Sequence, residues 1–140
     1  MAENFKIITQ FVKDMSSETP NVETYLYVKE YIKNYNLNIE ITTKPLKNRM
    51  IEVSTKLDYM DKGKSKNKSH FEMNYASIIK IDEEIKDRKI IEKIILCDVQ
   101  KEIYPSLEKV FINLLSSSGF PNIKFEKKID FEKLYKEKFN

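Results

Sequence analysis

The chain has 140 residues, of which 41% are hydrophobic and 34% charged, and its formal net charge is +3. Two glycines, one cysteine and one histidine exclude a glycine-rich phosphate loop, an internal disulfide and a structural zinc site of the usual cysteine and histidine type. No apolar run approaches the ~20 residues of a membrane-spanning helix, and the first residues lack the pattern of a signal peptide. We therefore expect a cytoplasmic protein with one domain over residues 1–140 and no direct membrane insertion.

Apolar and polar residues alternate in four segments of the first half of the chain, which predicts four strands. These segments are residues 5–12, 37–41, 51–59 and 71–81. The lysine-rich residues 62–68 join the last two, so we expect an antiparallel hairpin with this segment at its tip. Residues 14–21 are expected to interrupt regular structure, because Pro20 lacks an amide donor and the surrounding Ser, Asp and Asn favour turns. Residues 22–32 match neither the helical nor the strand period.

The second half of the chain changes to helical spacing. One helix is predicted over residues 83–98, opening on Glu83, where the helix dipole favours an acid. A second helix is predicted over residues 103–115, with Gly119 as a left-handed cap beyond its end. A last amphipathic segment covers residues 129–139. Strands followed by helices predict an α+β fold, with a four-stranded antiparallel sheet followed by helices packed on one face.

The sequence contains no evident set of catalytic residues. Cys97 and His70 are the candidates for thiol chemistry, but they lie on different predicted elements and no residue is placed to orient the imidazole. We interpret the cysteine as a small buried side chain and the histidine as a surface residue. No serine stands in the G-x-S-x-G turn that exposes a nucleophile. The chain is therefore not expected to be an enzyme, or to bind a metal or a cofactor.

Two features indicate binding instead. Eight tyrosines and eight phenylalanines are more than a core of this size needs. Tyrosine suits surfaces that are wet when free and covered when bound, since it combines apolar area with a polar tip. The segment 62–68 holds four lysines and no acid, and without them the net charge would be 3 − 4 = −1. It is interpreted as a solvated hairpin tip, while a small nucleic-acid-binding protein that contacts phosphates with this loop stays open as an alternative.

Five motifs, in chain order, resemble those of the SecB family of protein-export chaperones. Residues 13–21, KDMSSETPN, resemble the family's K-D-[IL]-S-x-E-x-P-N motif, and residues 71–76, FEMNYA, resemble its E-V-x-Y-x-G strand. Residues 103–105, IYP, are similar to the L-F-P at a helix start. Residues 118–121, SGFP, and residues 130–135, DFEKLY, resemble the family's ending, G-x-F-P…N-F-x-x-L-[FY].

The resemblance implies an ATP-independent holdase that assembles as a homotetramer, a dimer of dimers. Such a chaperone binds unfolded secretory precursor proteins in apolar grooves and delivers them to the SecA translocation ATPase. Nucleic acid is not an expected partner under this interpretation. A SecB-like chaperone that serves a toxin–antitoxin system is a variant that the motifs leave open.

The resemblance also implies roles for individual residues. Those expected to contact SecA are Asp14, Glu18, His70 and Glu72, where His70 replaces an apolar residue of the family. Those expected to line the client groove are Tyr25, Tyr27, Tyr31, Ile79, Phe131 and Leu134. Core packing is the competing interpretation for Ile79 and Phe131. Those expected at the oligomer interface are Phe71, Met73 and Tyr75.

Overall fold

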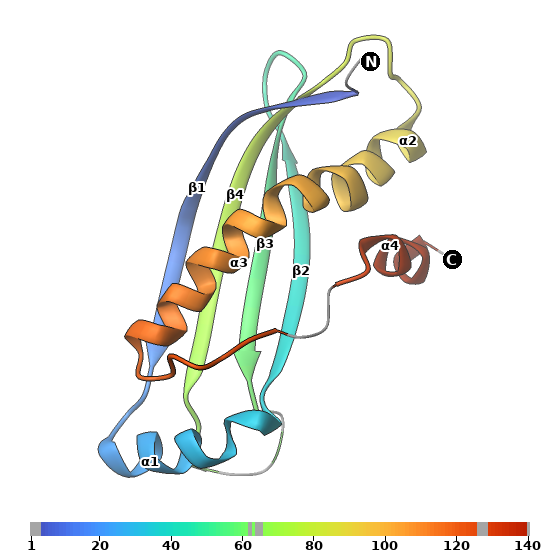
Figure 1. The fold of residues 1–140 in the computed structure, drawn as a ribbon. Coiled ribbons are helices and arrows are strands. Elements are labelled where there is room, and N and C mark those ends of the chain that lie inside the picture. The colour runs from blue at the N-terminus through green and yellow to red at the C-terminus, as the bar shows by residue number, and fades with distance from the viewer. Residues whose placement is uncertain (1–3, 62, 64–65, 126–128, 140) are drawn as a thin grey trace.

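The computed structural model describes residues 4–61, 63, 66–125 and 129–139. Its centre is a four-stranded antiparallel sheet with the strand order β1-β4-β3-β2 (Figure 1). The strands are β1 (Phe5–Glu18), β2 (Asn36–Pro45), β3 (Met50–Met60) and β4 (His70–Ile81). The predicted hairpin of the third and fourth strands is confirmed, and so is the α+β class.

The helices lie at one end of the sheet and on one of its faces (Figure 1). The helix α1 (Val22–Tyr31) and a short 3-10 turn, η1 (Ile32–Asn34), connect β1 to β2 across the sheet's end. One helical run follows β4, consisting of α2 (Arg88–Lys93), the π-helical segment η2 (Ile94–Asp98) and α3 (Val99–Ser117). The helix α3 crosses one face diagonally, and α4 (Phe131–Phe139) lies on the β2 side of the sheet (Figure 1).

Side-chain alternation along β3 and β4 decides which residues meet α3. The buried, odd-numbered residues that face it are Val53, Thr55, Leu57, Tyr59, Phe71, Met73, Tyr75, Ser77, Ile79 and Ile81. From α3, residues spaced by four contribute Ile103, Leu107, Phe111 and Leu115, each 0% exposed. The even-numbered residues point to the other face of the sheet, which none of the described helices covers. We call it the open face.

A buried polar pair also joins α3 to the sheet. The amide Nε2 of Gln100 donates to Thr55 Oγ1 at 3.0 Å, and the Thr55 hydroxyl donates to Gln100 Oε1 at 3.2 Å. Both residues are 0% exposed. Because the two side chains satisfy each other, the pair fixes where α3 docks on β3 without leaving a buried polar group unmatched.

The interruption predicted at residues 14–21 begins later than expected. β1 continues to Glu18, because its backbone pairs with β4 as far as the register pair of Glu18 and His70. The turn is confined to the following residues, where Asn21 caps α1 by accepting a hydrogen bond from the amide of Thr24 at 2.8 Å. The segment that matched neither period is thus a helix, held by two buried residues, Thr24 and Val28.

The helix predicted over residues 83–98 begins five residues later than expected. Asp87 is its N-cap and accepts a hydrogen bond from the amide of Lys89 at 2.9 Å, whereas Glu83 lies in the preceding turn. The run then continues through α3, so Pro105 lies inside a helix and not at its start. Burial of one apolar stripe against the sheet offsets the backbone hydrogen bond that this proline cannot donate.

The predicted glycine cap is confirmed. Gly119 has φ 102°, a left-handed backbone conformation that residues other than glycine rarely adopt. Its amide donates to the carbonyl of Ser116 at 3.1 Å, and the amide of Phe120 donates to the carbonyl of Leu115 at 2.9 Å. These two bonds form the Schellman motif, which satisfies carbonyls at the end of α3 and turns the chain back toward the sheet.

Candidate binding surfaces

A groove of about 1200 Å³ lies beside β2, an edge strand of the sheet. One side is formed by η1 and the first residues of β2, and the other by residues 119–125 and α4. Its apolar lining residues are Ile32, Tyr35, Leu37, Ile39, Tyr59, Phe120, Ile123, Phe125, Ile129 and Leu134. We call this the β2 groove. Its volume and its largely apolar lining fit a large apolar ligand rather than a small polar one.

Ring contacts and hydrogen bonds fix the aromatic wall of the β2 groove. The ring centroid of Tyr59 lies 5.4 Å from that of Tyr35 and 5.5 Å from that of Phe125. The Tyr35 hydroxyl donates to the carbonyl of Ser69 at 3.1 Å and accepts from the amide of Ser69 at 2.8 Å. Burial raises the pKa of Tyr35 and of Tyr59, which disfavours ionised phenolates in this wall.

The predicted client-binding residues lie in different environments. Leu134 lines the β2 groove and is 39% exposed. Ile79 and Phe131 are 0% and 5% exposed, so they pack in the core and present almost no surface to a client. Tyr27 and Tyr31 contact each other on α1, with ring centroids 4.6 Å apart, and neither lines the groove.

Tyr25 lies behind a wall of the groove. Its hydroxyl donates to the carbonyl of Gly119 at 2.9 Å, and its ring centroid lies 5.3 Å from that of Phe120. A Cβ at position 119 would approach Tyr25 Cε2 to 2.7 Å, so the glycine is needed for this contact as well as for its φ. Tyr25 therefore positions the groove segment 119–125.

Most of the groove is not predictable from the sequence. The alternation at Leu37 and Ile39 predicts a half-buried strand, but nothing in the pattern places a second wall opposite them. That wall includes Ile123 and Phe125, whose alternation after the glycine cap was the available signal for an extended apolar segment.

The three residues predicted at the oligomer interface face α3. Phe71 and Met73 are 0% exposed and Tyr75 is 7% exposed. The Tyr75 hydroxyl donates to Gln10 Oε1 of β1 at 3.0 Å, within the same chain. The single chain thus covers these side chains already and leaves little of their surface for a contact between subunits.

The four residues predicted to contact SecA gather on the open face. In the register of β1 and β4, Glu18 lies opposite His70 and Asp14 lies opposite Asn74. Glu72 lies two residues beyond His70 on the same strand, and therefore on the same face. Pairing of β1 with β4 thus brings residues that are more than fifty positions apart in the sequence onto one polar surface.

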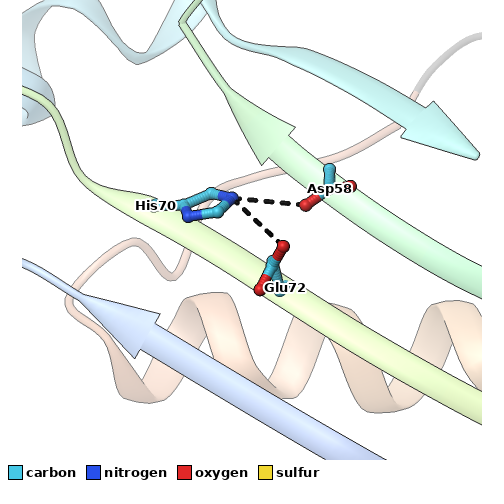
Figure 2. A group of neighbouring side chains, drawn as sticks. All are labelled: Asp58, His70 and Glu72. Carbon is cyan, nitrogen blue, oxygen red and sulfur yellow. Dashed lines mark hydrogen bonds and ion pairs between the residues drawn. The ribbon is translucent and has the colours of Figure 1, made fainter.

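Asp58 joins this surface from β3, and it was not among the residues predicted to contact SecA. It lies opposite Glu72 in the register of β3 and β4. Figure 2 shows the side chains converging, with His70 Nε2 3.2 Å from Asp58 Oδ1 and 3.7 Å from Glu72 Oε1. Lys56 Nζ lies 3.3 Å from Glu72 Oε1, and the hydrogen bond with Glu72 raises the pKa of Lys56. We call Glu18, Asp58, His70 and Glu72 the open-face cluster.

The environment of Cys97 does not suit a nucleophilic thiol. It is 0% exposed, it donates to the carbonyl of Phe131 at 3.6 Å, and burial raises its pKa. It packs beneath α4, whereas His70 lies on the open face. Of the lysine-rich segment 62–68, residues 62, 64 and 65 lie outside the described residues.

Comparison with known proteins identifies the chain's relatives. The family model described as SecB, preprotein translocase subunit SecB, matches residues 1–140. The chain is 56% identical over 140 residues to the "Putative protein-export protein SecB" of Pelagibacter ubique (strain HTCC1062), covering 100% of both chains. It is 23% identical over 137 residues to the protein-export protein SecB of Parvibaculum lavamentivorans, covering 98% of this chain and 80% of that one.

A solved structure shares the fold. It is the Mycobacterium tuberculosis Rv1957 SecB-like chaperone in complex with a ChAD peptide from Rv1956 HigA1 antitoxin. The match has a TM-score of 0.66 at 11% identity and covers 90% of this chain and 88% of that one. At this identity the likeness concerns the fold alone.

The family match and the full-length relative define the class of protein, a non-enzymatic chaperone of protein export. The chain belongs to the SecB family of preprotein translocase subunits, as its motifs indicated. Membership of this protein-export family implies binding of precursor proteins and of SecA. None of the described helices is long and apolar enough to cross a membrane.

Proposed function

We propose that the chain is an ATP-independent holdase of the cytoplasm, with one chaperone domain over residues 1–140. It binds unfolded secretory precursors in the β2 groove and hands them to SecA. The observation that carries this proposal is the combination of a fixed apolar groove with an edge strand of the sheet. An extended client can pair its backbone with the edge while its apolar side chains enter the groove.

This arrangement explains why no defined client sequence is needed. Each apolar side chain of the client contributes ~25 cal/mol per Å² of buried area, whatever its position in the client's sequence. Backbone pairing adds hydrogen bonds that every residue except proline can make. Four lysines at the groove, Lys29, Lys33, Lys124 and Lys133, keep its rim solvated and leave the apolar contacts to the walls.

SecA docks, in this proposal, on the open face. The open-face cluster and Asp14 give a local excess of carboxylates, although the chain as a whole has a net charge of +3. Screening limits the reach of charges in solution to about 8 Å, so docking depends on these few acids and not on the total charge. Client binding and SecA docking then use different surfaces of the chain.

The homotetramer also belongs to this proposal, with an interface revised from the sequence analysis. β1 is an edge strand, and its residues Ile8, Phe11, Val12 and Met15 are 39% to 47% exposed. An exposed apolar edge strand tends to pair with another chain. Association through β1 covers this apolar surface and places several β2 grooves on one particle, which strengthens client binding through effective concentration.

Site-specific photo-crosslinking tests the groove. A photoreactive side chain at Leu134, in the groove, should crosslink to a reduced, permanently unfolded protein, and the same group at Leu26 should not. Leu26 is the matched control, because it is 59% exposed on α1 and does not line the groove. Crosslinking from Leu26 alone would overturn the assignment of the groove.

Aggregation assays test the activity itself. The protein should suppress light scattering by an unfolded client at near-stoichiometric ratio, without ATP and with little dependence on salt. A nucleic-acid-binding protein would instead bind oligonucleotides with an affinity that falls steeply as salt rises. That pattern, with no suppression of aggregation, would exclude the holdase.

A further inference from the structure

The open-face cluster contains three potential metal ligands. One ligand atom from each of Asp58, His70 and Glu72 lies within 4.8 Å of the other two. The side chains are 20%, 37% and 32% exposed, so a dissolved ion can reach them. They project from two hydrogen-bonded strands, and Figure 2 shows them turned toward a common point.

The register of the sheet concentrates negative charge at this point. Asp58 and Glu72 lie directly opposite each other, an arrangement of like charges that destabilises a sheet. Glu18 lies opposite His70 and adds a third carboxylate on the same face. Lys56 offsets only part of this charge through its ion pair with Glu72. A bound divalent cation would relieve the remaining repulsion.

We propose that Asp58, His70 and Glu72 bind a divalent cation of the Zn²⁺ class. Zinc bonds of about 2.1 Å in tetrahedral geometry separate the ligand atoms by about 3.4 Å. His70 Nε2 already lies 3.2 Å and 3.7 Å from the two carboxylate oxygens, so small rotations of the acids complete the set. The imidazole favours zinc, cobalt or nickel over calcium and magnesium, which prefer oxygen ligands alone.

The site has three protein ligands and leaves one position for water. Lys56 competes with the metal for Glu72, since its ammonium lies 3.3 Å from the oxygen that would coordinate. The sequence predicts no metal site, because it lacks the usual cysteine and histidine sets and because no local pattern places Asp58 beside His70. The site does not depend on the proposed function.

Calorimetric titration of the tag-free chain with ZnCl₂ tests the site. We expect saturable binding of one ion per chain, and a thermal unfolding midpoint that rises with zinc concentration. His70→Gln and Asp58→Asn should each weaken binding by at least about tenfold, the lower limit for disturbing a metal site. Lys56→Met should tighten it, because a competing cation is removed.

The matched control is Glu52→Gln. Glu52 is a carboxylate on the same strand and face as Asp58, but it pairs with Lys13 at 2.8 Å, outside the cluster. This variant should bind zinc as the parent chain does. With Co²⁺ in place of zinc, the visible absorption of a tetrahedral complex should appear in the parent and be lost in His70→Gln.

Two results would overturn the proposal. One is the absence of saturable zinc binding up to about 1 mM, a concentration at which even weak sites fill. The other is binding that His70→Gln and Asp58→Asn leave unchanged, since the ion would then be held elsewhere.

Discussion

The substitution Leu134→Gln tests the client groove with a magnitude that follows from the structure. Leu134 is 39% exposed in the β2 groove, and a bound client would cover this remaining surface. Full burial of a leucine side chain contributes about 2 kcal/mol, so its exposed fraction contributes about 0.8 kcal/mol to binding. An amide buried there without a partner costs about 1 kcal/mol more.

The two contributions sum to about 1.8 kcal/mol, which corresponds to about 20-fold weaker binding of the client. Fluorescence anisotropy of a labelled, permanently unfolded protein measures this loss directly. The control is Leu26→Gln, which makes the same chemical change at an exposed position of α1 outside the groove. Leu26→Gln should leave the affinity unchanged. The covered part of Leu134 already contributes about 1.2 kcal/mol to folding, so both variants are compared well below their thermal unfolding midpoints, where each stays folded.

Equal losses in the two variants would refute the reasoning, since they would show that binding follows total surface hydrophobicity. An unchanged affinity in Leu134→Gln would do the same, because it would place the client elsewhere.

Three further predictions concern SecA docking, assembly and stability. Glu72→Lys should weaken SecA docking, measured by surface plasmon resonance, and leave aggregation suppression intact, whereas Glu30→Lys on α1 should change neither; equal loss of both activities would contradict two separate surfaces. Phe11→Asp should lower the particle mass found by light scattering, because it places a charge in the β1 edge, and Ile90→Asp, at a residue 49% exposed elsewhere, should not; a tetramer in both would exclude this interface. Gly119→Ala should lower the free energy of unfolding by about 2 kcal/mol, because it strains a left-handed residue and meets Tyr25 at 2.7 Å; denaturant titration showing no loss would mean that the segment relaxes.

Local patterns were sufficient for the central hairpin. Leu57 and Tyr59 alternate with charged residues on β3. Such alternation of apolar and charged residues indicates a strand with one buried face. The cap at Gly119 was equally local, because glycine after an apolar helical stripe and before a proline leaves few other conformations. Such features depend only on neighbours in the sequence.

Pairing between distant segments overruled local preference elsewhere. The polar residues 14–18 favour a turn, yet they extend β1 because β4 supplies backbone partners along their whole length. Pro105 favours a helix boundary, yet α3 passes through it because its apolar stripe is buried on both sides of the proline. In both cases tertiary contacts outweigh an intrinsic propensity of a few kcal/mol or less.

The sequence alone determined the family, the four strands, the helices of the second half, and the adjacency of His70 and Glu72, since residues two apart on a strand share a face. Only the tertiary structure decided where the binding surfaces lie. The β2 groove requires residues 119–125 to return beside a strand some eighty positions earlier, and the open-face cluster requires Asp58 to meet Glu72 in one register. Neither contact is encoded by a local period, because each arises when separate elements bury their apolar faces together.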